Sequence, residues 1–177
     1  MRSSVSRDGV DEVIDQWAQV RPDLDVSAME VFGRLHRSFL LYRSAIGTVF
    51  ARLGTNEAGF DVLATLRRSG PQHRLATGEL ARRTLVTTGG MTLRVKRLEK
   101  AGLVRRERDD ADNRVVYVEL TPAGLELVDR VAVEHFHNMA GMLDGLKDRE
   151  RDQLARLLSR LHQTLCAVDG AQAIADG

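Results

Sequence analysis

A short basic segment carries side chains that can bind the phosphates and bases of DNA. They recur at helical spacing on one side of residues 91–100 and are Thr92, Lys96, Arg97 and Lys100. Met91, Val95 and Leu98 occupy the other side, so the segment is expected to form a helix that packs through its apolar face. Gly89 and Gly90 stand at its start, where helix N-terminal N–H groups can approach phosphate closely. The pattern is typical of a helix that enters the major groove.

The elements before this helix would position it. A short helical pattern covers residues 78–84, and residues 85–90 supply the chemistry of a turn and a helix start. Within that stretch, Thr87, Thr88 and Gly90 are candidate DNA-binding residues. Two helices joined in this way form a helix-turn-helix.

The elements after it predict a β-hairpin and a new helix. Residues 103–107 and 114–120 are strand-like, and the stretch 109–113 between them is typical of a turn. Thr121 directly before Pro122 predicts a helix that begins at the proline with the threonine as its N-cap. The expected fold class is therefore mainly α with a small β wing, a winged helix-turn-helix with further helices on either side.

Arg114 is the candidate for a DNA contact at the tip of the hairpin. The wing of such a domain reaches towards the minor groove, and an arginine suits the narrow groove of A·T-rich DNA. The alternative role is an ion pair with Asp110 or Asp112 that rigidifies the hairpin.

Four motifs follow one another in a fixed order along the second half of the chain. They are Glu79-Leu80-Ala81, the run from Lys96 to Val104, Asp112-Asn113-Arg114 and Leu120-Thr121-Pro122-Ala123-Gly124. In type and order they resemble the MarR family of bacterial transcriptional regulators. Residues 21–25 and 60–70 resemble the branch that holds the PecS, urate-responsive and TamR regulators, so the resemblance covers nearly the whole chain. It implies a ligand-responsive regulator, a repressor, that binds double-stranded DNA as a homodimer.

Two positions depart from the family pattern. Ala76 replaces the threonine that usually opens the first helix of the motif, so Thr77 is expected to cap a helix that begins one residue later. Leu93 replaces a residue that is often polar on the recognition helix, which leaves the base preference open and the fold unaffected.

Apolar residues repeat at helical spacing at both ends of the chain. One seam over residues 26–52 includes Phe32 and Phe39, and the first of two seams after residue 122 continues through Met142 and Leu143. Interleaving with a second copy is expected in preference to packing within one subunit. The predicted organisation is N-terminal helices at 1–56 (an extra helix at about 9–19, a dimerisation helix at about 26–52), the winged helix-turn-helix at 57–121 and C-terminal dimerisation helices at 122–177.

The resemblance also implies a ligand site made of Trp17, Asp61, Arg94 and Arg106. In the urate-responsive branch, a tryptophan on an extra N-terminal helix, an aspartate and two arginines bind the ligand, and these four residues align with those positions. The chemistry is coherent without the family, because Arg94 lies three residues after Met91, points inwards and needs an anionic partner. Asp61 or a bound anion could be that partner, and a flat anion could stack on Trp17 and bind both arginines.

An anion that competes with Asp61 for Arg94 would displace the recognition helix on which Arg94 stands. The expected effector is urate, another purine, or a polycarboxylate such as citrate or aconitate. Three alternatives stay open: a structural Asp61–Arg94 ion pair with Trp17 in ordinary packing, a MarR-type regulator that responds to a phenolic ligand or to oxidation, and a winged-helix module that binds protein.

The net charge of +1 conceals a segregation of charge along the chain. Residues 67–114 contain 13 Lys or Arg and six Asp or Glu, a net charge of +7, and the remaining residues carry a net charge of −6. Positive charge is concentrated where DNA would lie, which favours a DNA-binding protein over a protein-binding module.

Other classes of function find little support in the sequence. It contains no phosphate-binding glycine motif, nucleophile elbow or metal-ligand spacing, so neither an enzyme nor a protein that needs a cofactor or metal is expected. The single Cys166 excludes an intrachain disulfide and is expected to be a buried apolar side chain rather than an oxidant sensor. The lack of a long apolar stretch or secretion signal predicts a cytoplasmic protein without a membrane partner.

Overall fold

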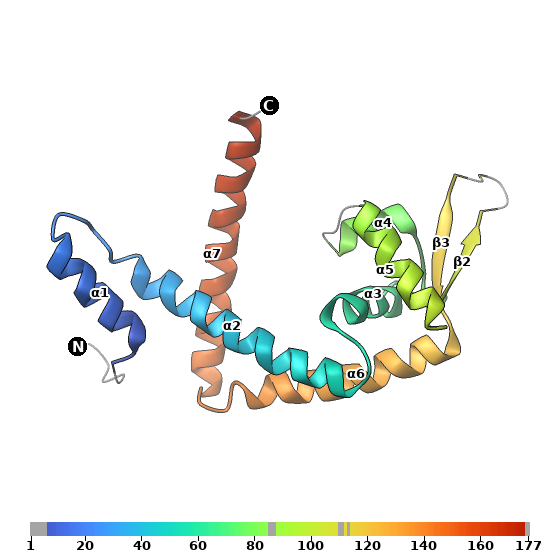
Figure 1. The fold of residues 1–177 in the computed structure, drawn as a ribbon, viewed down its shortest axis with the longest axis horizontal. Helices are drawn as coiled ribbons and strands as arrows, with labels where there is room; N and C mark the ends of the chain where they lie inside the picture. The colour runs from blue at the N-terminus through green and yellow to red at the C-terminus, as the bar shows by residue number, and fades with distance from the viewer. Residues whose placement is uncertain (1–6, 85–87, 110–111, 113, 176–177) are drawn as a thin grey trace. The chain divides into compact units, whose positions relative to one another are not determined.

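The computed structural model describes residues 7–84, 88–109, 112 and 114–175. Within these residues the chain is mainly helical with one small sheet, which is the fold class that the sequence predicts (Figure 1). The helices are α1 (Gly9–Val20), α2 (Met29–Arg52), α3 (Glu57–Arg67), α4 (Thr77–Arg83), α5 (Thr88–Lys100), α6 (Pro122–Gly141) and α7 (Asp148–Ala175). The strands are β1 (Arg74–Ala76), β2 (Val104–Arg108) and β3 (Val116–Leu120).

Two compact units divide the chain, residues 1–132 and residues 133–177, and their boundary lies inside α6. The first unit contains α1 to α5, the sheet and the first half of α6. The second contains the rest of α6 and α7. The domain boundaries expected at residues 56 and 121 remain a prediction.

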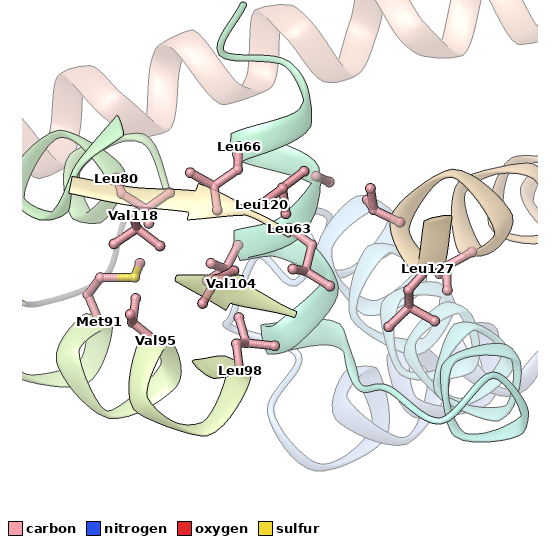
Figure 2. Packing of buried hydrophobic residues seen from close by; sticks show 14 of the residues in the cluster. Leu63, Leu66, Leu80, Met91, Val95, Leu98, Val104, Val118, Leu120 and Leu127 are labelled. Carbon is pink, nitrogen blue, oxygen red and sulfur yellow. The ribbon is translucent and has the colours of Figure 1, made fainter. Parts of the chain in front are cut away.

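The core of the first unit forms where α3, α4 and α5 pack against the sheet. Met91, Val95 and Leu98 point from α5 towards Val104 of β2 and Val118 of β3 (Figure 2). All five side chains are buried, so the predicted apolar face of this helix is confirmed. Burial of each side chain of this size stabilises the fold by roughly 1.5–3 kcal/mol.

The sheet has the strand order β1-β3-β2, and β3 is antiparallel to both neighbours. The hairpin of β2 and β3 is the predicted wing. The sequence does not predict β1, because a strand of three residues is too short to display an alternating pattern.

The register of the sheet assigns its charged residues to two faces. Glu119 lies between Arg74 of β1 and Arg105 of β2, whereas Val118 lies beside Arg106 of β2. Because side chains alternate between the faces of a sheet, Arg106 shares the face of the buried Val118 and Arg105 lies on the opposite face.

Thr121 caps α6, as the sequence predicts. Its Oγ1 accepts a hydrogen bond from the Gly124 N–H at 3.1 Å and donates one to the Gly102 carbonyl at 2.6 Å. Gly102, with φ of 72°, adopts the left-handed conformation that commonly follows the last turn of a helix. One hydroxyl group therefore joins the turn after α5 to the start of α6.

The expectation that Thr77 caps α4 is wrong. The helix begins at Thr77, and its N-cap is Ala76, whose side chain has no hydrogen-bond acceptor. The Thr77 hydroxyl instead donates to the Val116 carbonyl at 2.9 Å. It therefore joins the start of α4 to β3, because Thr77 already belongs to the first helical turn.

The helix expected from about residue 26 begins later. α2 starts at Met29, because the Asp25 carboxylate accepts the Ser27 N–H at 2.9 Å and holds a turn before the helix. The end of α2 at Arg52 agrees with the prediction.

The second unit contains the connection between α6 and α7. α6 ends at Gly141, so Met142 and Leu143 lie beyond it and not on the helix as predicted. Arg151 of α7 donates from Nε to the carbonyls of Leu143 at 3.2 Å and Leu146 at 2.9 Å, which satisfies polar groups of the connection. Across the described residues, no helix combines the length and apolarity that a bilayer span requires.

α1 packs against α2 through a glycine contact and two charged contacts. A Cβ at Gly33 would lie 2.8 Å from Cγ1 of the buried Val10, so the missing side chain lets the helices approach. Arg34 donates to the Asp8 carboxylate at 2.9 Å, and its Nη2 lies 2.9 Å from Asp11 Oδ1. Asp8 is also the N-cap of α1, so these contacts attach the beginning of α1 to α2.

Replacing Gly33 with leucine is expected to separate α1 from α2. The new side chain would need the space of Val10, whose β-branched side chain has little rotational freedom. Hydrogen exchange followed by mass spectrometry should show faster exchange over residues 9–20. Gly47→Leu is the matched control, because a Cβ at Gly47 would meet no described atom within 4 Å. Unchanged protection of α1 in Gly33→Leu would contradict the packing.

Candidate nucleic-acid interface and effector residues

α5 presents its basic side chains to solvent. The exposed side chains on this face are Thr92, Lys96, Arg97 and Lys100. The helix begins at Thr88, within the predicted helix start, and Gly90 in its first turn is partly buried. Thr87 and the side chain of Thr88 lie outside the described residues. A cationic face on a helix whose back is buried is the arrangement that contact with DNA needs.

Arg114 lies near the tip of the hairpin and is exposed. Its backbone N–H donates to Asp112 Oδ1 at 3.0 Å, and the Asp112 N–H donates to Asp109 Oδ1 at 2.9 Å. These bonds hold the turn through the backbone, and the Arg114 guanidinium forms no ion pair with any described residue. The alternative pairing with Asp112 is therefore not formed, and Asp110 lies outside the described residues.

Glu99 of α5 and Arg106 of β2 form an ion pair that links the helix to the wing. Glu99 Oε2 lies 2.6 Å from Nη2 and accepts a hydrogen bond from Nε at 2.9 Å. This bond lowers the pKa of Glu99 and raises the pKa of Arg106. Both side chains are partly exposed, so solvent screens the pair and limits its contribution to at most about 1 kcal/mol. It adds a charged contact to the buried apolar contacts between α5 and β2.

Asp61 of α3 and Arg94 of α5 are partly buried neighbours. Burial raises the pKa of Asp61, and the positive charges of Arg94 and Arg68 act in the opposite direction. Among the described residues, Asp61 and Arg94 form no direct ion pair with each other. Burial therefore disfavours the charged form of Asp61, while two nearby arginines favour it.

Trp17 lies on α1 and is 41% exposed. Among the described residues, no hydrogen bond, ion pair or ring contact joins it to Asp61, Arg94 or Arg106. Of the four residues implied as a ligand site, Asp61 and Arg94 are close enough for the Arg94 charge to lower the pKa of Asp61, and Arg106 is paired with Glu99.

Cys166 is exposed on α7, so the expectation of a buried thiol is wrong. Leu165, the residue before it, is also exposed. Cys166 Sγ lies 3.6 Å from His162 Nε2, at the helical spacing that the sequence indicates. Within the described part of the chain, no group of three His, Cys, Asp or Glu side chains could hold a metal ion.

The sequence does not reveal Glu99 as the partner of Arg106. Glu99 stands beside Lys100 in the last turn of α5 and is typical of a solvated helix face. The turn at Gly102 directs β2 back along the helix and brings the two charges together. The sequence did contain one signal for this pair: the opposite charges of Glu99 and Arg106 stand seven residues apart, on either side of the turn at Gly102.

Comparisons with known proteins agree with this architecture. A model of the MarR family matches residues 55–116. The HTH-type transcriptional regulator PecS of Dickeya dadantii (strain 3937) is 36% identical over 156 residues, which span 88% of this chain and 94% of that protein. The HTH-type transcriptional repressor YetL of Bacillus subtilis (strain 168) is 27% identical over 152 residues, 86% of this chain and 90% of that protein.

A solved structure shows the same fold. The crystal structure of Sco3205, a MarR family transcriptional regulator from Streptomyces coelicolor, in complex with DNA, matches with a TM-score of 0.71 and 26% identity. The match covers 80% of this chain and 93% of that one. These relatives are transcriptional regulators rather than enzymes. The chain belongs to the MarR family of DNA-binding transcriptional regulators.

Proposed function

We propose that a homodimer of this chain represses transcription from a pseudo-palindromic operator and that a small anionic metabolite releases it. α5 would enter the major groove, and Arg114 would reach the adjacent minor groove. The observation that carries this proposal is the separation of two faces of α5, with Met91, Val95 and Leu98 in the core and Lys96 and Arg97 exposed. A helix fixed from behind can present its charges to DNA without rearrangement.

Exposed apolar side chains support the dimer. On α2, Leu40 and Leu41 are 52% and 73% exposed, and on α7, Leu157 and Leu165 are 50% and 44% exposed. Large apolar side chains left exposed along a helix are typical of surfaces that bind another protein. In a symmetric dimer the two α5 helices would lie about 34 Å apart, one turn of B-DNA.

The environment of Asp61 and Arg94 supports the effector site. An anion bound at Arg94 would replace Asp61 as the electrostatic partner of Arg94. The negative charges of the anion and of the Asp61 carboxylate would repel each other. Arg106 could join the site only by exchanging Glu99 for the anion, which would also remove the charged contact between the hairpin and α5. Trp17 would supply a stacking surface for a purine such as urate, while citrate or aconitate would bind through the arginines alone. A coupling of roughly 1–3 kcal/mol between anion and DNA would suffice for release.

Replacing Arg94 with alanine is expected to abolish release of DNA by the effector while DNA binding persists. A gel-shift titration with urate and citrate measures this, on a duplex that the wild-type protein selects from a randomised pool. Arg68→Ala is the matched control, because Arg68 also acts on the pKa of Asp61 but stands on α3 rather than α5. Undiminished release from Arg94→Ala would remove Arg94 from the mechanism. Equal loss in both variants would assign the effect to Asp61 alone.

A further inference from the structure

Leu93 is an exposed apolar side chain at the centre of the cationic face of α5. It is 52% exposed, although leucine is among the residue types that are most often buried. It stands two residues after Met91 and two residues before Val95, both of which are buried and point into the core (Figure 2). Two residues turn an α-helix by about 200°. Leu93 therefore points almost directly away from the core that holds the helix.

The neighbours of Leu93 distinguish it from the single exposed leucines that are common on protein surfaces. Lys96 and Arg97 follow it by three and four residues, the spacing at which side chains of a helix lie next to each other, and both are exposed. Gly89 and Gly90 precede it by four and three residues and have no side chains, so the preceding turn leaves Leu93 uncovered. The face consequently has a short apolar centre between two long cationic side chains.

Thymine offers the apolar group that such a side chain can contact in the major groove. All four base pairs present hydrogen-bond donors and acceptors there, and thymine adds a methyl group at C5. A leucine placed against a G·C pair would cover polar groups and leave them without hydrogen bonds to water. Lys96 and Arg97 lie on either side of Leu93 and are long enough to extend past it to phosphates or base edges.

We propose that Leu93 recognises a thymine in each half of the operator, through contact between its side chain and the 5-methyl group of the base. The inference rests on the proposed function, because it requires α5 to enter the major groove. Leucine neutralises no phosphate, so Leu93 acts through its fit to a base and not through charge. Burial of one methyl group contributes about fourfold to affinity, and the two halves of a symmetric operator together contribute about 15-fold.

The test is binding of the full chain to duplexes in which deoxyuridine replaces thymine. The parent duplex is one that the wild-type protein selects from a randomised pool, and its thymines are replaced one symmetric pair at a time. Deoxyuridine lacks only the methyl group and pairs with adenine in the same way. For one pair, the wild-type chain should bind about 15-fold more weakly in fluorescence anisotropy. Leu93→Ala should bind the parent duplex more weakly and should no longer distinguish it from that uracil duplex.

Lys96→Ala is the matched control on the same face of α5. It should weaken binding to both duplexes by the same factor and make the dependence of affinity on salt shallower, whereas Leu93→Ala should leave the salt dependence unchanged. Alanine at position 93 is compatible with the fold, because the side chain is exposed and alanine favours helices.

Two outcomes would overturn the inference and leave the proposed function intact. One is a wild-type affinity that no thymine replacement lowers, and the other is an unchanged preference for thymine over uracil in Leu93→Ala. If the randomised pool yields no preferred duplex, the proposed function fails and the role of Leu93 fails with it.

Discussion

Gly124→Ala is expected to lower the free energy of unfolding by about 1–3 kcal/mol or more. An added Cβ would overlap the carbonyl oxygen of Leu103 and lie 2.9 Å from its carbonyl carbon. Both are backbone atoms, so no change of rotamer can relieve the contact. The same carbonyl accepts the Thr121 N–H at 3.1 Å, so a shift of Leu103 would also break that bond.

Urea denaturation at one fixed protein concentration measures the change, since the unfolding of the proposed dimer would depend on concentration. Gly78→Ala is the control within a helix, because an added Cβ there meets no described atom within 4 Å. That variant should be neutral or gain up to about 1 kcal/mol, the usual difference between alanine and glycine in a helix. Equal stabilities of the two variants would show that α6 and Leu103 are not in close contact in solution.

The double variant Lys96→Ala, Arg97→Ala is expected to bind a selected operator duplex about 100-fold more weakly or worse. Each side chain is exposed on α5, and each bond to a base or phosphate of this kind contributes roughly 1–3 kcal/mol. The dependence of log affinity on log salt should become shallower by about one for each phosphate that the variant no longer neutralises. Fluorescence anisotropy over a series of salt concentrations measures both quantities.

Arg130→Ala provides the control for this experiment. It removes one exposed positive charge from α6, outside the face formed by α5 and the hairpin, and should leave both affinity and salt dependence unchanged. Wild-type affinity in the double variant would exclude this face of α5 as the DNA-binding surface. An equal loss in Arg130→Ala would point to a general effect of net charge.

Helix α5 could be predicted because its sequence alternates between two requirements every three or four residues. Met91, Val95 and Leu98 needed a core, and the basic residues Lys96, Arg97 and Lys100 needed solvent, so only one orientation of the helix satisfied both. The helix N-cap at Thr121 was equally predictable, because a threonine directly before a proline is typical of the start of a helix. Strand β1 could not be predicted, because it forms only by pairing with β3, some 40 residues away, and its own residues show no strand pattern.

The effector residues show the opposite limit. The spacing from Met91 correctly indicated that Arg94 is partly buried, and its interaction with Asp61 follows from the packing of α3 on α5. Arg106 has an acidic neighbour that no local rule identifies, since Glu99 reaches it only through the direction of the chain after Gly102. The position of Trp17 relative to these residues could not be predicted, because it depends on how several helices pack together and not on the sequence of α1 alone.

The link between Glu99 and Arg106 gives ionic strength two points of action on this regulator. Added salt displaces the protein from phosphates, as it does for any cationic DNA-binding surface. Added salt also screens the half-exposed ion pair between Glu99 and Arg106, so the hairpin gains freedom of movement as the salt concentration rises. A plot of log affinity against log salt should consequently bend downwards for the native chain, and uncharged glutamine at position 99 should restore a straight line.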